Sequence, residues 1–154
     1  MNSTQLTRVQ KQKSGRAMHP MQRWAWIYTA LFLGVVSLGY IPGLTDDQGY
    51  LLGLFRIELK DDLLHLGSAL WAAWAAWNSP KASTFYFKLF GLVYFFDGVV
   101  GFLTGQGYLD LGIFLYGPAP LDLLTRIGAN IPHILIGGIA ILVGFVLSRR
   151  YENN

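Results

Sequence analysis

Four long apolar runs constrain the fold of this chain more than any other feature. They cover residues 24–41, 62–78, 83–104 and 130–148. Charged residues make up only 14% of the chain, against roughly 25% in an average soluble domain. Because a helix needs about 20 apolar residues to cross a bilayer, we predict an all-α integral membrane protein with four transmembrane helices. The second run is the shortest, and a buried helix or half of a re-entrant hairpin is the alternative for it.

Basic residues predict the orientation of these spans. The segment 1–23 contains no acid and five basic residues: Arg8, Lys11, Lys13, Arg16 and Arg23. Lys81 lies between the second and third spans, and Arg149 and Arg150 follow the fourth. The positive-inside rule then predicts two cytoplasmic tails, 1–23 and 149–154, around a four-span domain at 24–148 in a plasma (inner) membrane. The basic N-terminal tail is also a candidate for binding anionic lipids.

A short pattern occurs twice, at an offset of 68 residues. In each copy a histidine is followed by small residues at steps that keep them on one helix face. His65, Ala69, Ala72 and Ala76 form the first copy, and His133, Gly137, Ala140 and Gly144 form the second. The pair Gly39-Tyr40 returns as Gly107-Tyr108 at the same offset. We interpret the pattern as two pseudo-repeated helical hairpins, related by a pseudo-two-fold axis along the membrane normal.

An Asx residue precedes each of the two histidines by three positions. Asp62 and Asn130 are therefore the expected N-caps of the second and fourth spans, since Asx side chains accept from free backbone N–H groups in a first helical turn.

The longer outer loops are expected to contain short interfacial helices. Residues 50–60 mix apolar and charged side chains, as amphipathic helices at a membrane surface do. Residues 107–120 are rich in aromatic and aliphatic side chains, and residues 121–128 have a helical pattern after Pro120. We expect these segments to cap the outer end of the bundle.

Asp97 is exceptional because it lies in the middle of an apolar run. A carboxylate at that depth costs about 2.5–3.5 kcal/mol on insertion scales, so we expect it to face the bundle interior and find a partner. The small-residue faces turn both histidines inward at a similar depth. We predict a buried polar cluster of His65, Asp97 and His133, with Tyr94 as a fourth member, just beneath the outer surface.

Three functions are compatible with this cluster. In the first, which we favour, the cluster locks the bundle of a non-enzymatic scaffold or accessory subunit that needs no cofactor or metal. In the second, His65 and His133 are paired ligands of haem or of a metal ion. In the third, Asp97 serves a small transporter or a proton pathway.

Other features narrow the function further. The chain has no cysteine, which excludes disulfides and thiolate metal sites. It also lacks a phosphate loop, a nucleophile motif and an HExxH motif, so we do not expect an enzyme. The lipid bilayer is the expected partner, and nucleic acid is not. Trp71, Trp74 and Trp77 form a ridge predicted to face lipid, with contact to a second copy or to another membrane protein as the alternative.

The two histidine segments resemble a bacterial membrane family. They read Asp62-Leu63-Leu64-His65-Leu66-Gly67 and Asn130-Ile131-Pro132-His133-Ile134-Leu135-Ile136-Gly137. These stretches are similar to an Asn/Asp-x-x-His-x-x-x-Gly signature of the family catalogued as domain of unknown function 4383. Ala69 stands where that signature has glycine in the first copy. The resemblance covers roughly residues 24–148 and implies a four-helix fold and a membrane location, but no activity.

Overall fold

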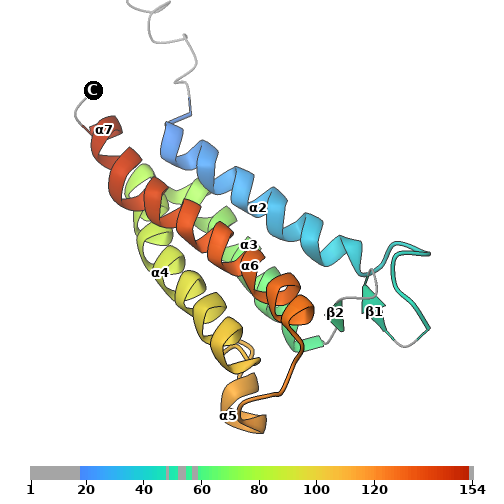
Figure 1. Cartoon of the computed structure of the whole chain (residues 1–154). Helices are drawn as coiled ribbons and strands as arrows, with labels where there is room; N and C mark the ends of the chain where they lie inside the picture. The colour runs from blue at the N-terminus through green and yellow to red at the C-terminus, as the bar shows by residue number, and fades with distance from the viewer. Residues whose placement is uncertain (1–17, 48, 52–54, 57–58, 153–154) are drawn as a thin grey trace, which may run out of the picture.

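The computed structural model describes residues 18–47, 49–51, 55–56 and 59–152, and most of these residues are helical. Four long helices run side by side in alternating directions (Figure 1): α2 (Pro20–Leu38), α3 (Leu59–Asn78), α4 (Pro80–Thr104) and α6 (Leu123–Ile141). The last helix continues through a π-helical turn, η1 (Leu142–Leu147), into α7 (Ser148–Glu152). The all-α prediction is confirmed, and the four helices overlap the four apolar runs.

Local capping explains where α2 and α4 begin and where α4 ends. In α2 the first residue is Pro20, and the side chain of His19 accepts a backbone N–H of the first turn. In α4 the first residue is Pro80, and the side chain of Ser79 caps in the same way. Proline suits this position because its missing N–H needs no helical partner. Gly105 ends α4 with a φ of 81°, a backbone conformation that favours glycine.

The loop between α2 and α3 differs from the prediction. Its described residues form two antiparallel strands, β1 (Tyr50–Leu51) and β2 (Phe55–Arg56), instead of an interfacial helix over 50–60. The prediction is wrong because turn-forming residues override the amphipathic pattern. Gly49 adopts a φ of 85°, and the Asp46 carboxylate accepts the backbone N–H of Tyr50 at 2.8 Å.

The loop between α4 and α6 contains the short helix α5 (Gly112–Tyr116), and a short helix is expected in residues 107–120. The helical segment predicted at 121–128 is the beginning of α6 and not a separate element. α6 continues without a break through Pro132, so the fourth helix begins earlier than the predicted span at 130.

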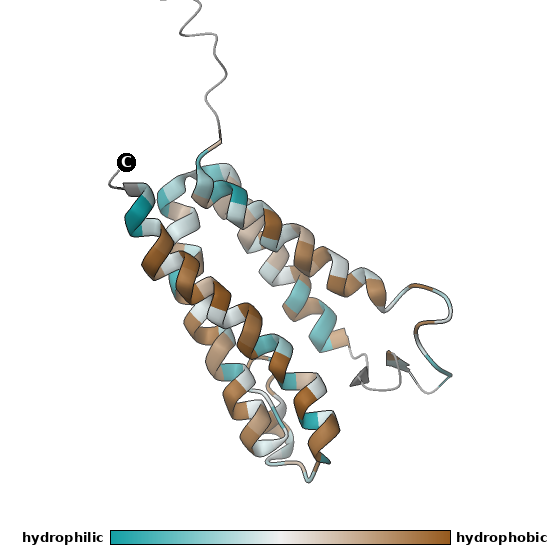
Figure 2. Ribbon diagram, turned by 45° about the horizontal axis from the view of Figure 1, so that its top comes forward, coloured by the Kyte–Doolittle hydropathy of each residue, from teal (hydrophilic) through white to brown (hydrophobic). Residues whose placement is uncertain are grey.

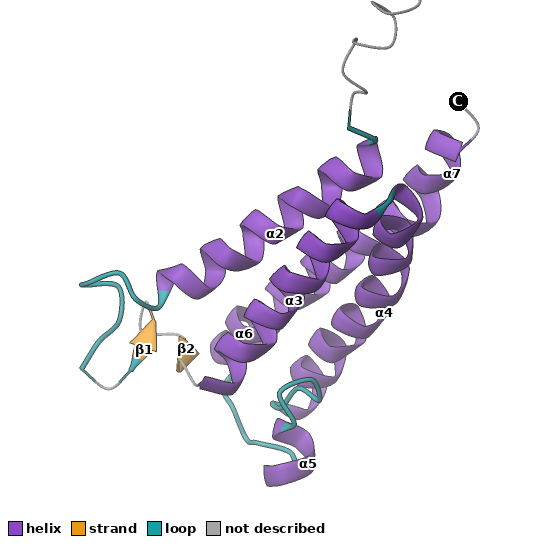
Figure 3. Ribbon diagram, turned by 180° about the vertical axis from the view of Figure 1, so that it is seen from behind, coloured by secondary structure: helices purple, strands orange, loops and turns teal. Residues whose placement is uncertain are grey.

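The helices pair as two hairpins. α2 packs most extensively along α3, and α4 along α6, while the contacts between the two pairs are fewer (Figure 3). Small residues allow the second pair to approach closely. A Cβ atom added at Gly137 would collide with the backbone of Phe95, and one added at Gly144 would lie 2.8 Å from the backbone nitrogen of Lys88.

Aromatic rings fill the space between the two hairpins. Buried side chains of α2 and α4 contact one another edge to face or in stacks: Tyr28, Phe32, Tyr86, Phe87, Phe90 and Tyr94. The core of the bundle is therefore aromatic at its centre and made of small residues along the helix contacts.

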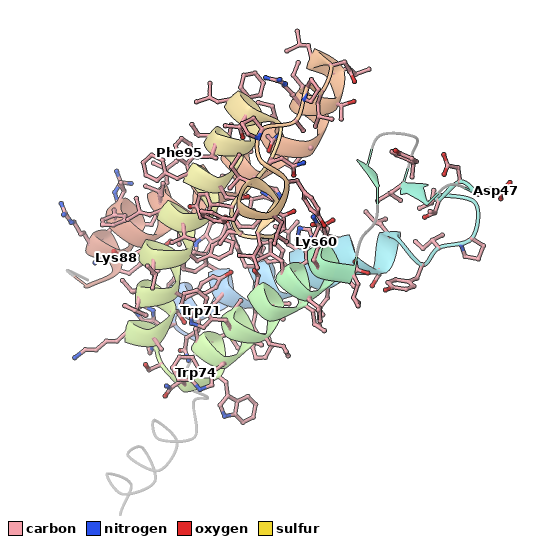
Figure 4. All side chains as sticks on the ribbon, turned by 90° about the horizontal axis from the view of Figure 1, so that it is seen from below. Asp47, Lys60, Trp71, Trp74, Lys88 and Phe95 are labelled. Carbon is pink, nitrogen blue, oxygen red and sulfur yellow. The ribbon has the colours of Figure 1, made fainter. Side chains whose placement is uncertain are left out.

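The ridge of tryptophans on α3 divides into two environments. Trp74 and Trp77 are 57% and 83% exposed, which agrees with a surface position. Trp71, which is labelled in Figure 4 together with Trp74, instead lies edge to face against Tyr86 of α4, with ring centroids 5.1 Å apart. The expectation that all three point away from the bundle is wrong for Trp71.

Two of the helical segments are long and apolar enough to cross a membrane, namely Pro80–Thr104 and Leu123–Tyr151. α2 and α3 are 19 and 20 residues long, but their first turns contain polar residues, Gln22 and Arg23 in α2 and Lys60, Asp61 and Asp62 in α3. Hydrophobic residues cover much of the sides of the helices, and hydrophilic residues are more frequent near the ends (Figure 2).

The first and last described segments lie at the same end of the bundle, which we call the inner end. The ring of His19 at the start of α2 lies 6.2 Å from the ring of Tyr151 in α7, edge to face. Residues 149–152, predicted as part of a tail, extend the last helix. Most of the predicted basic tail, residues 1–17, lies outside the described residues.

Candidate functional site

Asp97 is 3% exposed, and its two carboxylate oxygens have separate partners. Oδ2 lies 2.9 Å from Nδ1 of His133 on α6. Oδ1 accepts the backbone N–H groups of Tyr108 at 2.7 Å and of Leu109 at 2.8 Å, in the loop after α4. Because a carboxylate only accepts, Nδ1 of His133 carries the shared proton. One side chain of α4 therefore holds both the facing helix and the following loop.

His65 and Tyr94 lie beside this pair. Nε2 of His65 on α3 is 3.1 Å from the hydroxyl of Tyr94. The Tyr94 ring stacks on the His133 ring with centroids 4.3 Å apart, and the two imidazoles meet edge to face at 6.1 Å. The structure thus brings His65, Tyr94, Asp97 and His133 together. It does so through two separate hydrogen-bonded pairs joined by ring contacts, and His65 makes no hydrogen bond to Asp97.

Aromatic side chains enclose the cluster. Phe32 stacks on His65 with centroids 5.9 Å apart, and Phe90 stacks on Tyr94 at 4.8 Å. Tyr94 is 1% exposed, whereas the His133 side chain is 20% exposed. Hydrogen bonds are stronger in such an apolar environment, and an unpaired polar group there is correspondingly costly. The cluster therefore stabilises the helix bundle only while all of its hydrogen bonds are made.

Two glycines permit the close approach around Asp97. A Cβ atom at Gly107 would lie 2.8 Å from Oδ1 of Asp97, so a side chain there would push the loop off the carboxylate. A Cβ atom at Gly98 would lie 2.8 Å from Cβ of His133. The loop and α6 reach the acid because neither position has a side chain.

The predicted N-cap role of Asp62 is wrong. α3 begins at Leu59, so Asp62 lies within its first turn and not before it. Its Oδ2 instead accepts the hydroxyl proton of Tyr40 at 2.7 Å, which ties the end of α2 to α3. That hydrogen bond raises the pKa of the Tyr40 hydroxyl, with the negative charge of Asp62 as a further cause.

The predicted N-cap role of Asn130 is also wrong. α6 begins at Leu123, and its N-cap is Asp122, whose Oδ1 accepts the backbone N–H of Thr125 at 3.1 Å. Asn130 lies inside the helix, where its Nδ2 donates to the carbonyl oxygen of Arg126 at 3.0 Å. The helix simply extends beyond the apolar run, and a better cap upstream determines its start.

The loop residues that bind Asp97 are not part of the predicted cluster. Tyr108 and Leu109 contribute backbone N–H groups, which leave no trace in side-chain chemistry. The recurring Gly107-Tyr108 pair was the available signal. The Tyr108 hydroxyl donates to the carbonyl oxygen of Val93, and burial, together with the Asp97 charge, raises the pKa of Tyr108. The hydroxyl therefore remains protonated and can keep donating.

The surroundings of His65 and His133 bear on the alternative of a haem or metal site. Within the described ranges, no group of three or more His, Cys, Asp or Glu residues is placed to hold a metal ion. Nε2 of His65 is engaged by Tyr94, and the stacked Tyr94 ring covers a face of His133. The bond from Nδ1 of His133 to Asp97 does not oppose ligation through Nε2, because metal-bound histidines commonly donate their other N–H to a carboxylate. A porphyrin between the imidazoles would have to displace that ring.

The fold and the cluster define a mostly helical protein, with two helices long and apolar enough to cross a membrane and a buried His–Asp pair near one end of the bundle. Comparisons with protein families, with curated proteins and with solved structures find no match. The resemblance to domain of unknown function 4383 therefore stays a prediction.

Proposed function

We propose that this chain is a non-enzymatic, four-span protein of the plasma membrane, acting as a scaffold or accessory subunit, and that its polar cluster is structural. The observation that carries the proposal is the complete use of the Asp97 carboxylate, with one oxygen on His133 and the other on two loop N–H groups. Such a carboxylate fastens α4, α6 and the outer loop to one another and leaves little freedom for a ligand or a transported proton.

The distribution of charge supports four spans with both termini in the cytoplasm. Arg23, Lys81, Arg149 and Arg150 lie at the inner end, beside the His19–Tyr151 contact or at the turn between α3 and α4. The opposite end holds more acids than bases: Asp46, Asp47, Asp61, Asp62, Asp110 and Asp122 against Arg56, Lys60 and Arg126. The Nζ of Lys60 lies 3.1 Å from Asp110. At 1.5 Å per residue, α2 and α3 approach the thickness of a bilayer core, roughly 30 Å.

The paired packing supports a pseudo-repeat of two hairpins. In both copies of the histidine pattern the following small residues are buried: Ala69, Ala72 and Ala76 in α3, and Gly137, Ala140 and Gly144 in α6 and η1. The two histidines lie close together, with ring centroids 6.1 Å apart. The Asp97–His133 bond, by contrast, belongs to the second hairpin alone.

The topology can be tested by labelling single cysteines, because the chain has none of its own. Asp47→Cys and Leu115→Cys lie in exposed outer loops, and Lys81→Cys and Arg150→Cys lie at the exposed inner end. In intact cells a membrane-impermeant maleimide should label the first two and not the second two. Labelling of all four, or of the inner pair alone, would contradict the proposed orientation.

The structural role of the cluster can be tested with two replacements of Asp97. In liposomes, wild-type protein should produce no pH-driven proton flux beyond that of protein-free vesicles. Asp97→Leu should unfold at a markedly lower temperature than wild type. Asp97→Asn keeps an oxygen for the two loop N–H groups, so its unfolding temperature should lie between those of Asp97→Leu and wild type. A flux that is present in wild type and abolished by Asp97→Asn would instead favour a proton pathway.

A further inference from the structure

A pocket of about 470 Å³ lies at the inner end of the bundle, and none of the four cluster residues lines it. Three parts of the chain surround it, namely the start of α2, the turn that opens α4 and the start of α7. Its polar lining consists of His19, Ser79, Lys81, Thr84 and Ser148. Its volume is in the range of about 300–1,000 Å³ found for small-ligand sites.

Thr84 is the residue that points to a ligand. It is 9% exposed, and its hydroxyl has no hydrogen-bond partner among the residues that the structure describes. Among the described residues the only fully buried polar side-chain atom without a partner is the Tyr86 hydroxyl, so the Thr84 hydroxyl is accessible and free to bond a molecule in the pocket. Since Thr84 lines the pocket, a polar group bound there would satisfy it.

The pocket is electropositive. The N-termini of two long helices, α2 and α4, open beside it, and a helix N-terminus favours negative charge. Lys81 adds a full positive charge at the rim, and the exposed Arg149 and Arg150 directly follow Ser148. This end of the bundle is formed by residues 18–24, 77–84 and 147–152. These three segments contain a single acid, Glu152.

Several donors remain free to face an anion. The Oγ of Ser79 accepts the N–H of Ala82, so its own hydroxyl proton can be donated. The Nδ1 of His19 accepts the N–H of Met21, which leaves Nε2 as the protonated ring nitrogen. Ser148 donates to the carbonyl oxygen of Gly144 and is already used. With Thr84, three neutral donors and one ammonium group surround the space.

We propose that this pocket binds the phosphate group of an anionic phospholipid from the inner leaflet. The remaining wall is apolar, formed by Met21 and Pro80, and suits the glycerol and upper acyl region of a lipid better than a free inorganic ion. The residues named for this site do not belong to the basic segment 1–17. It depends on the proposed membrane insertion but not on the role of the His–Asp cluster.

The first test uses the full chain in detergent micelles, titrated with dioleoyl phosphatidylglycerol and followed by native mass spectrometry. Parallel titrations use dioleoyl phosphatidylcholine and inorganic phosphate. A one-to-one adduct with phosphatidylglycerol should form about tenfold more tightly than with phosphatidylcholine, as one hydrogen bond to a charged group would provide. Equal binding of both lipids, or occupation by inorganic phosphate at the same affinity, would overturn the proposal. If the protein incorporates into phosphatidylcholine nanodiscs but does not prefer phosphatidylglycerol, the proposed lipid site is wrong. The proposed membrane insertion is unaffected by that result.

Three variants then locate the site. Lys81→Gln removes the rim charge, and Thr84→Val removes the unpartnered hydroxyl while keeping the side-chain shape. Each should weaken phosphatidylglycerol binding several-fold without lowering the thermal stability of the lipid-free protein. Lys88→Gln is the matched control, because it removes one positive charge from the same helix outside the pocket, where Lys88 lies over the ring of Phe145. An equal loss in Lys88→Gln would show general charge attraction and overturn the assignment.

Discussion

Nδ1 of His133 and Oδ2 of Asp97 lie 2.9 Å apart across the interface of α4 and α6, and the second oxygen of the same carboxylate holds the loop that joins these helices. A single acid thus connects two helices and their connection. This arrangement explains why an acid occurs in an otherwise apolar helix, because both carboxylate oxygens of Asp97 are hydrogen-bonded within the protein.

Replacing His133 should reveal how much the pair contributes. His133→Leu leaves the Asp97 carboxylate buried without its side-chain partner, and we expect a loss of roughly 3 kcal/mol in the free energy of unfolding. His133→Asn places an amide donor near the position of Nδ1, so its loss in the free energy of unfolding should be clearly smaller than that of His133→Leu. Denaturant unfolding in micelles measures both. Equal stability of the two variants would contradict the role of the hydrogen bond.

Two adjacent glycines in α6 provide a test of close helix packing. A Cβ atom at Gly137 collides with the backbone of Phe95, whereas one at Gly138 lies at an ordinary 3.8 Å from the Phe95 ring. Gly137→Ala should therefore destabilise the bundle by about 1–3 kcal/mol through overpacking. Gly138→Ala should be neutral or slightly stabilising, because alanine favours the helix. Thermal unfolding of the two variants compares them directly, and equal effects would contradict the close contact.

Tyr86 and Tyr94 are both buried in α4, but their hydroxyls differ. Tyr86 Oη has no hydrogen-bond partner in the described part of the chain, whereas Tyr94 Oη lies 3.1 Å from His65. Tyr86→Phe should leave stability unchanged or raise it by up to about 1 kcal/mol, and Tyr94→Phe should lower it by about 1 kcal/mol. Calorimetry of the two single variants checks the prediction. A destabilised Tyr86→Phe protein would contradict the prediction.

The start of α6 should depend on pH through Asp122. Hydrogen bonds from the side chain and backbone of Thr125 hold the pKa of the Asp122 carboxyl below its ordinary value. A lowered pKa means that the cap stabilises the helix fully above about pH 4 and loses this effect as the pH falls through the lowered pKa. Hydrogen exchange of the first turn of α6 should then accelerate at acidic pH. Asp122→Asn should keep the cap and show no such dependence.

The cluster members could be predicted because polar side chains in apolar helices have few alternatives. Asp97 and the two histidines must turn inward in a membrane, and the small residues after each histidine indicate the packing face. The pairing itself could not be predicted. That His65 bonds to Tyr94 and not to Asp97 depends on helix rotations of a few tens of degrees, which periodicity does not define.

The errors concern local backbone chemistry. Asp62 and Asn130 have the right residue type for N-caps, but α3 and α6 extend past them, to Leu59 and Leu123. The hairpin at Tyr50–Leu51 and Phe55–Arg56 replaced an expected amphipathic helix, because Gly49 and Asp46 set a turn. The contacts of Asp97 with Tyr108 and Leu109 use main-chain donors that any residue possesses, so no pattern of side chains could predict them.

The attachment of Asp97 to His133 has a consequence for biogenesis. In the proposed four-span topology, α4 emerges from the ribosome before the residues of α6, so its acid would enter the translocon without its imidazole partner. We therefore expect the third and fourth spans to leave the translocon together as a hairpin, with the acid shielded in the protein channel until the histidine arrives.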